Sequence, residues 1–456
     1  MSQTIAAIAT PPLPSAIGIL RLSGDGAIEA AAAVFRPASG KSLAEYESRR
    51  LVYGTLLGPD GAPIDQALAT VSRAPRSYTG EDTAEFQCHG SPAVLHLGLE
   101  ALFAQGVRQA GPGEFTRRAF LNGKLDLTQA EAVADLIDAE TPAAVRQAAG
   151  QLSGALGRRV GAIYDGLVDL MAHFHAVLDY PDEDIDPFRA DTIRAGLEEA
   201  RAGLSALLAT YERGRYIAGG VPCVLVGRPN AGKSSLLNAL VGYDRAIVTD
   251  VPGTTRDTVE ARCRLGGVVL KLIDTAGLRD TEDAVERIGV ERSRAAMEGA
   301  ALILVLWDGS VPPVEEDGAL LERAAKLAPT ILVHTKADLP SAPVPFVNLD
   351  PLPPTVTVSA KTGQGLDELA EAVAALFPTG GAEAAGELLT NARQAEAARR
   401  ALAGVERAGE SLAAGITPDA LLTDVEEALS ALGELTGASV REDVTARIFQ
   451  RFCVGK

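Results

Sequence analysis

The chain has 456 residues, more than one hydrophobic core usually organises, so we expect about two to four domains. Hydrophobic residues make up 47% of the sequence and aromatic residues only 4%, so Ala, Leu, Val and Ile should build the cores. The formal net charge of −18 disfavours a broad basic surface for nucleic acid, and restricts such contact to a local patch or a partner protein.

Cysteine spacing and apolar runs narrow the class of protein further. The four cysteines are far apart and form no C-x-x-C pair, so neither a zinc site nor a disulfide framework is signalled. Pro11, Pro12 and Arg21 interrupt the N-terminal segment, which does not fit a secretory signal. No apolar run approaches the roughly 20 residues that a membrane span needs. We therefore expect a soluble, cytoplasmic protein.

Residues 1 to about 120 alternate short apolar runs with Gly and Pro. The runs Ala16–Leu22, Ala67–Val71 and Ala84–Cys88 predict strands. Ala93–Phe103 predicts a helix. An α+β domain fits this alternation.

From about Leu125 the hydrophobic period becomes helical. One long helix is predicted by apolar residues at three- and four-residue steps, namely Leu152, Leu156, Val160, Ile163, Leu167, Leu170, Phe174 and Val177. The same pattern returns near the other end at Leu421, Val425, Leu429, Leu432 and Leu435. We expect one helical domain made from both stretches, with another domain inserted between glycine-rich hinges at Arg213–Val221 and Pro378–Glu387.

The inserted segment opens with a phosphate-binding motif. Gly227–Ser234 reads GRPNAGKS and matches G-x-x-x-x-G-K-[ST]. Pro222–Val226 predicts a strand before it and Ser234–Leu240 a helix after it, which is the context that a phosphate loop requires. Backbone N–H groups there should hold the phosphates, Lys233 should reach the β- and γ-phosphates, and the Ser234 hydroxyl should ligate Mg²⁺.

Two further motifs lie where nucleotide-sensing loops are expected. Asp250–Asp257 (DVPGTTRD) has the position of a first switch loop, in which Thr255 would supply a second hydroxyl to Mg²⁺. Asp274–Gly277 (DTAG) follows a strand that ends at Lys271–Ile273. The next residue is Leu278, where Ras-like enzymes carry the Gln that orients attacking water, so another group must do this.

A guanine-recognition motif completes the set. In Thr335-Lys336-Ala337-Asp338 the aspartate would accept hydrogen bonds from the N1–H and exocyclic amine of guanine, a donor pair that adenine lacks. Thr335 replaces the commoner Asn, and we expect guanine selectivity to survive through Asp338, with the effect on affinity open. Ser359–Lys361 should lie behind the base. Four motifs in this order predict a GTPase, a hydrolase acting on GTP.

These motifs and their flanks resemble the MnmE (TrmE) family of tRNA-modifying GTPases over essentially the whole chain. The resemblance rests on GRPNAGKSSLLNAL, IVTDVPGTTRD, DTAGLRDTEDAVERIG, GILRLSG, YTGEDTAEFQCHG, PGEFTRRAFLNGKLDLTQAEAV and the terminal FCVGK. It implies an N-terminal α+β folate-binding and dimerisation domain (1–120), a discontinuous helical domain (121–216 and 380–456) and an inserted doubly wound α/β P-loop GTPase domain (217–379).

The resemblance also implies a catalytic arrangement. K⁺ would be held by Asn230, Thr249, Thr254 and the backbone carbonyl of Val251, and Glu286 would position water in place of the missing Gln. From sequence alone Glu286 is one acid among several. The implied GTP-binding residues are Asn230, Ala231, Gly232, Lys233, Ser234, Ser235, Thr249, Asp250, Val251, Pro252, Gly253, Thr254, Thr255, Asp274, Thr275, Ala276, Gly277, Thr335, Lys336, Asp338, Ser359, Ala360 and Lys361.

A folate site is implied in the N-terminal domain. By motif match, 5-formyl-tetrahydrofolate or a related tetrahydrofolate would contact Arg21, Glu85, Lys124 and Lys456. Without the resemblance, Arg21, Glu85 and Lys124 would be ordinary surface or turn residues. Cys453, between Phe452 and Val454, is typical of a small buried hydrophobe. The family tail implies instead a functional role, and nucleophile, proton donor and structural plug all stay open.

The implied biological role is modification of tRNA. With an MnmG-type FAD- and NADH-dependent partner, a homodimer would add a carboxymethylaminomethyl-type group at C5 of the wobble uridine, using a tetrahydrofolate one-carbon unit. Its GTPase domains would pair when K⁺ and nucleotide bind. The alternatives are a ribosome-assembly GTPase or a regulatory switch without modification chemistry. An acidic, Ala- and Leu-rich C-terminal stretch disfavours the ribosome-assembly alternative, since such proteins usually carry a basic domain.

Overall fold

The computed structural model describes residues 2–179, 190–243, 261–273, 295–342, 350–380, 386–414, 418–439, 445, 448–450 and 452–455. The chain forms two compact units. The first unit comprises Met1–Ala134, Gln151–Ala200 and Arg400–Lys456, and the second comprises Asp135–Gly150 and Arg201–Arg399. The unit boundaries fall within helices α4 (Leu127–Ile137), α5 (Pro142–Leu152), α7 (Ala190–Leu208) and α13 (Ala392–Ala413).

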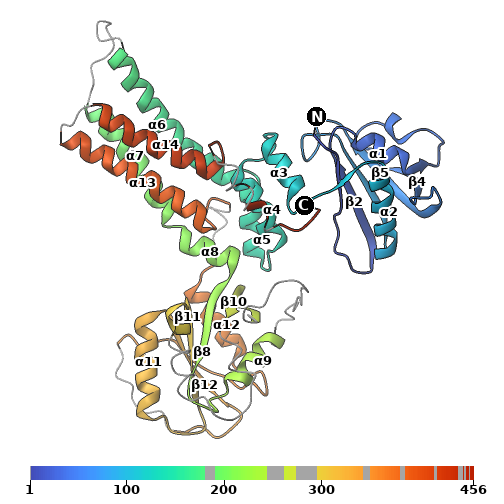
Figure 1. The fold of residues 1–456 in the computed structure, drawn as a ribbon. Coiled ribbons are helices and arrows are strands. Elements are labelled where there is room, and N and C mark those ends of the chain that lie inside the picture. The colour runs from blue at the N-terminus through green and yellow to red at the C-terminus, as the bar shows by residue number, and fades with distance from the viewer. Residues whose placement is uncertain are drawn as a thin grey trace. The chain divides into compact units, whose positions relative to one another are not determined.

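The first unit contains a seven-stranded sheet of order β3-β4-β5-β6-β2-β1-β7 (Figure 1). Neighbouring strands are antiparallel except β1 and β7, which are parallel. The strands are β1 (Ile5–Ile8), β2 (Ser15–Ser23), β3 (Phe35–Pro37), β4 (Val52–Leu57), β5 (Pro63–Ser72), β6 (Thr83–Gly90) and β7 (Arg108–Gln109). The predicted strands lie within β2, β5 and β6, so these three predictions are confirmed.

Helices α1 (Ala27–Ala33) and α2 (Pro92–Ala104) pack with this sheet, because one side of each helix is apolar. Leu95, Leu99 and Leu102 of α2 share a buried cluster with Leu20 and Phe86 of the sheet. A short 3₁₀ turn (Leu43–Glu45) joins the same cluster. Helix α3 (Glu114–Leu121) contributes Phe115 to a separate buried cluster with β1. The predicted helix at Ala93–Phe103 is confirmed as α2.

Helices α6 (Ala155–Asp179) and α14 (Pro418–Thr436) pack against each other in the first unit. The apolar stripe of α6 is buried at Leu156, Val160, Leu167 and Leu170. The single predicted helix is wrong at its start, because Leu152 belongs to α5 and Ser153 and Gly154 separate the two helices. The apolar period continues across this break, and period alone does not reveal the turn.

The second unit is built on a six-stranded sheet of order β13-β12-β11-β8-β10-β9 (Figure 1). All neighbours are parallel except β9 and β10, which form a hairpin at the edge. The strands are β8 (Val221–Val226), β9 (Ala261–Leu265), β10 (Val268–Leu272), β11 (Leu302–Asp308), β12 (Thr330–Thr335) and β13 (Thr355–Thr357). Strands β8 and β11 are almost wholly buried, as expected of parallel strands covered on both faces.

Helices cover both faces of this sheet. Helices α9 (Lys233–Tyr243) and α12 (Leu366–Leu376) share one buried cluster with the strands. Helix α11 (Glu315–Leu327) shares another cluster, formed with the strand residues that point to the opposite face. The arrangement is the predicted doubly wound α/β fold. The predicted strand at Pro222–Val226 and helix at Ser234–Leu240 are therefore confirmed.

The first predicted hinge is mostly helix. Residues 213–219 lie within α8 (Tyr211–Gly219), and only the turn to β8 follows it. Gly214 is buried, and a Cβ there would lie 2.1 Å from the carbonyl oxygen of Leu389. This glycine therefore permits close packing rather than flexibility. The second predicted hinge lies partly outside the described residues, since 381–385 are not among them.

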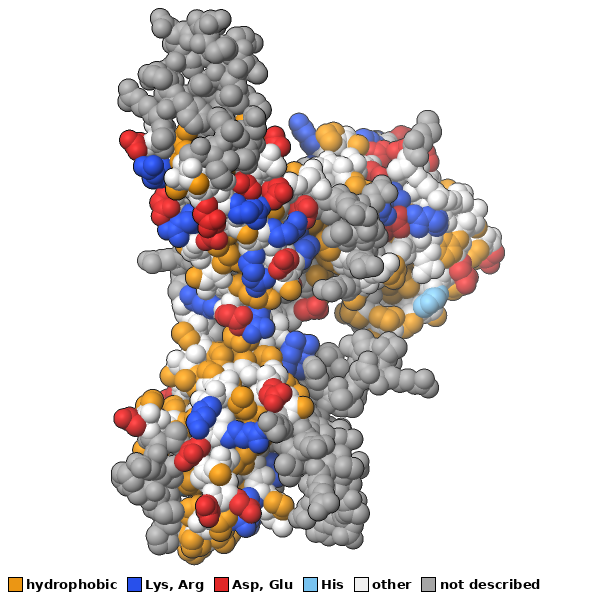
Figure 2. All heavy atoms as spheres, turned by 60° about the vertical axis from the view of Figure 1, so that its left-hand side comes forward, with side chains coloured by type: hydrophobic (Ala, Val, Ile, Leu, Met, Phe, Trp, Pro, Cys, Tyr) orange, Lys and Arg blue, Asp and Glu red, His pale blue; other side chains and the backbone are white. Residues whose placement is uncertain are grey.

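Positive and negative side chains are interspersed on the face shown in Figure 2. This agrees with the composition, which disfavours a broad basic surface. None of the helices in the described part of the chain combines the length and apolar character needed to cross a bilayer.

Candidate functional site

The phosphate-binding motif forms the loop between β8 and α9, as the sequence predicts. Gly227 has φ +157°, and a Cβ there would lie 2.5 Å from the carbonyl oxygen of Leu306, so only glycine fits. Asn230 has φ +62°, in the left-handed region that Asn tolerates better than most residues. This backbone path carries the loop to the N-terminus of α9, where N–H groups are available to an anion.

Lys233 and Ser234 occupy the first turn of α9. The Lys233 Nζ donates hydrogen bonds to the carbonyl oxygens of Gly227 and Arg228, both at 2.8 Å. The ammonium group therefore lies over the loop, and burial lowers the pKa of Lys233 from its usual value. Ser234 and Ser235 are exposed at the same turn. Ammonium, hydroxyl and N–H groups together suit a phosphate chain with a bound cation.

The guanine-recognition motif begins at the end of β12, beside the phosphate loop. Thr335 is buried, and its hydroxyl lies 2.8 Å from the carbonyl oxygen of Ala231 and 3.0 Å from that of Trp307. The single hydroxyl proton can be donated to one of these oxygens at a time. Because β8 and β12 run parallel in the sheet, the loops that follow them lie at the same edge.

Asp338 is exposed and held by Ser359. The Ser359 hydroxyl donates a 2.8 Å hydrogen bond to Oδ1 of Asp338. This bond is the main cause that lowers the pKa of the Asp338 carboxyl from its usual value. The lowered pKa favours the ionised carboxylate, which is the form that could accept hydrogen bonds from guanine. The backbone N–H of Thr362 in turn donates to the Ser359 hydroxyl at 3.2 Å. Ser359 thus orients the carboxylate that is predicted to read the base.

Asp308 is a supporting residue that the sequence reasoning missed. Its Oδ2 accepts a 2.6 Å ion-paired hydrogen bond from Nζ of Lys336, which itself has φ +61°. Burial acts to raise the pKa of Asp308, but the hydrogen bonds from Lys336 and Ser310 lower it below its usual value. A polar residue directly after the apolar run that ends at Trp307 was the available signal.

The remaining nucleotide-site predictions lie outside the described residues. They are Thr249, Asp250, Val251, Pro252, Gly253, Thr254, Thr255, Asp274, Thr275, Ala276, Gly277 and Glu286. The implied catalytic acid, most K⁺ ligands and the second Mg²⁺ ligand are thus still predictions.

In the first unit, Arg21, Glu85 and the C-terminal tail come together. Arg21 and Glu85 are direct partners across β2 and β6, and Nε of Arg21 donates to Oε1 of Glu85 at 2.6 Å. Nη1 of Arg21 also donates to the carbonyl oxygen of Gly455 at 3.5 Å. The guanidinium lies 5.8 Å from the ring centres of both Tyr78 and Phe115, within cation–π range.

Lys124 lies against the loop that carries Tyr78. Its Nζ donates to the carbonyl oxygen of Pro75 at 3.1 Å. Tyr78 is exposed, and its hydroxyl lies 2.9 Å from that of Thr116. Tyr78 is an aromatic surface beside Arg21 that sequence reasoning did not single out. Lys456, the fourth predicted folate contact, lies outside the described residues.

The tail holds Cys453 at the surface. Phe452 is buried and packs against Phe449, which contacts Phe120. The carbonyl oxygen of Cys453 accepts a 3.3 Å hydrogen bond from the Gly113 N–H, and the next residue forms a bridge with Pro112. The buried position that the local sequence alone would suggest for Cys453 is taken by Phe452, and the functional role implied by the family tail stays a prediction. The other three cysteines are buried free thiols.

Comparisons with known proteins agree over the whole chain. The family profile described as "GTP-binding protein TrmE N-terminus" matches residues 4–124, and that described as "MnmE helical domain" matches residues 127–453. Proteins named tRNA modification GTPase MnmE are 47% identical in Chloroflexus aurantiacus and 49% identical in a strain of Thermus thermophilus, each covering 100% of both chains.

A solved structure, the G domain of the FeoB iron transporter of T. maritima, is 27% identical over 34% of this chain and 97% of its own. Its TM-score of 0.24 is too low to support a conclusion. The two profiles and the full-length relatives are sufficient without it. The chain belongs to the MnmE family of tRNA modification GTPases.

Proposed function

We propose that the chain binds and hydrolyses GTP at the carboxyl edge of the second unit's sheet, and that this hydrolysis serves tRNA modification. The observation that carries the proposal is the contact of Thr335 with the Ala231 carbonyl, 2.8 Å from the hydroxyl. This contact supports the proposal, because it joins the segment expected to read the base to the phosphate loop. The names of the relatives favour tRNA modification over the ribosome-assembly alternative.

The side chains of this edge have separate roles in binding. The loop N–H groups and Lys233 would hold the phosphates, with Lys233 exchanging its carbonyl partners for phosphate oxygens. Asp338 would accept the two guanine N–H donors while Ser359 holds it in place. An adenine nucleotide would leave that carboxylate without donors, so it would bind more weakly.

The donor set suits two cations. Ser234 and Thr255 offer hydroxyl oxygens, which are ligands that Mg²⁺ prefers beside phosphate. Asn230, Thr249, Thr254 and the carbonyl of Val251 would hold K⁺, and Asn230 is exposed on the phosphate loop. When bound, these cations supply positive charge near the bond that breaks, where negative charge develops. Glu286 would orient the attacking water in the absence of a Gln after Gly277.

Arg21, Glu85 and the tail residue Gly455, together called the Arg21 cluster, form the proposed folate site of the first unit. Glu85 offers a carboxylate to the amide and amine donors of a pterin, and Arg21 and Lys124 offer cations to a glutamate tail. Tyr78 supplies an apolar wall, and Cys453 lies on the tail that Arg21 contacts. A tetrahydrofolate one-carbon unit bound here would feed the carboxymethylaminomethyl group placed at C5 of the wobble uridine.

The proposed organisation divides the chain into four segments. The segments are residues 1–120, 121–216, 217–379 and 380–456, with the first forming a homodimer. The proposed partners are a second copy of the chain, a flavoprotein and tRNA. An MnmG-type flavoprotein would supply the redox chemistry and much of the tRNA contact. The interspersed charges of Figure 2 agree with a limited role of this chain in holding RNA.

Hydrolysis in KCl and in NaCl at equal ionic strength tests the proposal. With saturating GTP and Mg²⁺, we expect the rate in KCl to be at least about tenfold higher, because only K⁺ would fit the site near Asn230. Asn230→Gly keeps the left-handed backbone and removes the side-chain oxygen, so it should hydrolyse slowly in both salts. Equal wild-type rates would contradict the K⁺ site, and no hydrolysis in either salt would contradict the proposed function.

A further inference from the structure

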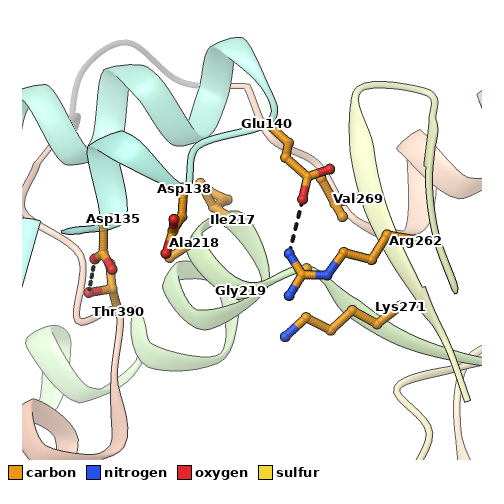
Figure 3. Close-up of a pocket in the computed structure, with 11 residues that line it drawn as sticks. Asp135, Asp138, Glu140, Ile217, Ala218, Gly219, Arg262, Val269, Lys271 and Thr390 are labelled. Atoms are coloured by element: carbon orange, nitrogen blue, oxygen red, sulfur yellow. Dashed lines mark hydrogen bonds and ion pairs between the residues drawn. The ribbon is translucent and has the colours of Figure 1, made fainter. Parts of the chain in front are cut away.

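A cleft of about 250 Å³ opens in the second unit (Figure 3), where Gly219 and Gly220 line it just before β8, whereas the phosphate loop follows the other end of that strand. The carboxylates of Asp135, Asp138 and Glu140 line one side of it. Arg262 and Lys271 of the β9–β10 hairpin line the other. One wall is therefore acidic and the other basic, and nothing in the proposed GTP or folate chemistry uses either wall.

The basic wall occupies a special place in the chain. Strand β9 begins at Ala261, shortly after the first switch motif Asp250–Asp257. Strand β10 ends at Leu272, just before the second motif Asp274–Gly277. The hairpin is the covalent link between the two motifs that sense the γ-phosphate in such enzymes. Any movement of those motifs acts on both ends of the hairpin.

The charges on the hairpin call for an acidic partner. Arg262 lies directly opposite Lys271 across the two strands, and like charges in such a pair destabilise a hairpin. Arg264 lies two residues further along β9 and so shares the face of Arg262, while Cys263 and Leu265 are buried on the other face. Carboxylates on the facing wall offset this repulsion.

Glu140 makes the contact between the walls. Its Oε1 lies 3.0 Å from Nη1 of Arg262, the pair marked in Figure 3. Its main-chain oxygen accepts a 3.2 Å hydrogen bond from Nη1 of Arg264. Both arginines of the edge strand thus hold the same residue, one through its side chain and one through its backbone.

The acidic wall is anchored to a different part of the unit. Oδ2 of Asp135 accepts a 3.2 Å hydrogen bond from the Thr390 hydroxyl. The side chain of Gln147 accepts from the Gly386 N–H at 2.8 Å and donates to the Leu388 carbonyl at 3.3 Å. Residues 135–150 are therefore fixed to residues 386–390, and Glu140 extends from this framework to the edge of the sheet.

We propose that Glu140 couples the β9–β10 hairpin to residues 135–150, so that the nucleotide bound at the phosphate loop alters the end of α4 and the start of α5. The inference rests on the proposed GTP binding and goes beyond it. A contact formed to different extents with GTP and GDP must change their relative affinities, because coupling is reciprocal. Arg262 is half exposed, so the coupling is modest.

A simpler role for these arginines predicts a different result. Charged residues on an edge strand protect it from pairing with other chains. If Arg262 and Arg264 only protect the edge strand from such pairing, their loss should change the affinities for GTP and GDP equally. The coupling role predicts unequal changes and restoration when the two charges are exchanged.

Nucleotide titration of the full-length chain distinguishes the two roles. We expect Glu140→Arg or Arg262→Glu to change the ratio of Kd for guanosine 5′-(β,γ-imido)triphosphate to Kd for GDP by about two- to fivefold. The variant carrying both changes should return the ratio to that of the wild type. Glu140→Gln is the milder variant if a charge reversal prevents folding. Glu396→Gln, which breaks an exposed 3.0 Å ion pair with Arg399, is the matched control and should leave the ratio unchanged.

Amide hydrogen exchange supplies the second readout. In the wild type, exchange within residues 135–150 should differ between the two nucleotides, and Glu140→Gln with Arg262→Gln should reduce that difference while residues 227–234 still respond. A response at 227–234 without one at 135–150, or equal changes in both Kd values, would overturn the coupling. No response at 227–234 in the wild type would instead contradict GTP binding itself.

Discussion

The nucleotide site and the Arg21 cluster are built in opposite ways. The phosphate loop is eight consecutive residues whose backbone is predicted to do much of the binding, so the residues must be adjacent in the sequence. The Arg21 cluster joins the side chains of Arg21 and Glu85 with the backbone carbonyl of Gly455, which three distant segments bring together. A site made by backbone leaves one contiguous motif in the sequence, whereas a site made by sheet register and a returning tail is divided among separate motifs.

The prediction with the largest expected effect tests whether the motif match identifies the catalytic acid. Glu286→Ala should lower the GTP hydrolysis rate by about 10²–10⁴-fold, because the group that orients water is lost. Affinities for GTP and GDP should change little, since the residue would act only on water. Single-turnover hydrolysis and fluorescent-nucleotide titration measure the two quantities. Normal hydrolysis by this variant would show that the motif match assigned the wrong acid.

A second prediction concerns base recognition at the same edge. Asp338→Asn should weaken GTP binding by about a hundredfold, because the amide N–H faces the guanine donors. It should improve binding of xanthosine triphosphate, whose C2 carbonyl accepts from that amide. Competition titration with both nucleotides checks this, and 5-formyl-tetrahydrofolate binding should be unchanged as a control. Retained GTP preference would mean that another residue reads the base.

The fold was predictable where the pattern of apolar residues fitted only one kind of secondary structure. The apolar runs of β8, β2 and β6 each fit only a strand. The break before α6 was missed because the helical period passes through Ser153 and Gly154 unchanged. The glycines near Arg213 suggested a hinge, but Gly214 serves the close approach of Leu389, a partner far away in sequence.

The residues of the candidate sites were likewise predictable from local motifs but not from contacts with distant segments. Lys233, Thr335, Asp338 and Ser359 lie together as their motifs predict. Asp308 was missed, because its role depends on the neighbouring strand and not on its own flanks. The exposure of Cys453 follows from the packing of Phe452 against Phe449, which its local sequence does not encode.

A third prediction tests the non-local region. Arg21→Ala should weaken 5-formyl-tetrahydrofolate binding by at least about tenfold, because a charged hydrogen-bond donor is lost. It should also speed amide exchange of residues 452–455, since the hydrogen bond from Arg21 to the Gly455 carbonyl is lost. Calorimetric titration and exchange mass spectrometry measure these effects.

Arg21→Lys is the matched control, because it keeps the charge and loses the guanidinium geometry, so we expect an intermediate affinity. Nucleotide affinity should stay at the wild-type value in both variants. Wild-type folate affinity in Arg21→Ala would remove Arg21 from the proposed site. Unchanged exchange in the tail would mean that its buried phenylalanines alone hold it.

The smallest expected effect concerns a place where the phosphate loop depends on a side chain that is distant in the sequence. Thr335→Val keeps the shape of the side chain and removes the hydroxyl that lies between the Ala231 and Trp307 carbonyls. The one hydrogen bond that this hydroxyl donates to either oxygen is then lost, which costs about 1–3 kcal/mol in the folded state. We expect GTP and GDP affinities to fall together by about two- to tenfold, because part of this cost is shared by the free and bound forms.

Thr335→Ser and Thr335→Asn complete the series, with nucleotide affinity measured by titration in each. Serine keeps the hydroxyl and should bind as the wild type does. Asn is the commoner residue of this motif, and its longer amide can donate to both carbonyls at once, so it should bind at least as tightly. If valine binds as tightly as threonine, the phosphate loop holds its position without help from β12. The position of the phosphate loop would then be set by its own segment, and its contrast with the Arg21 cluster would be sharper.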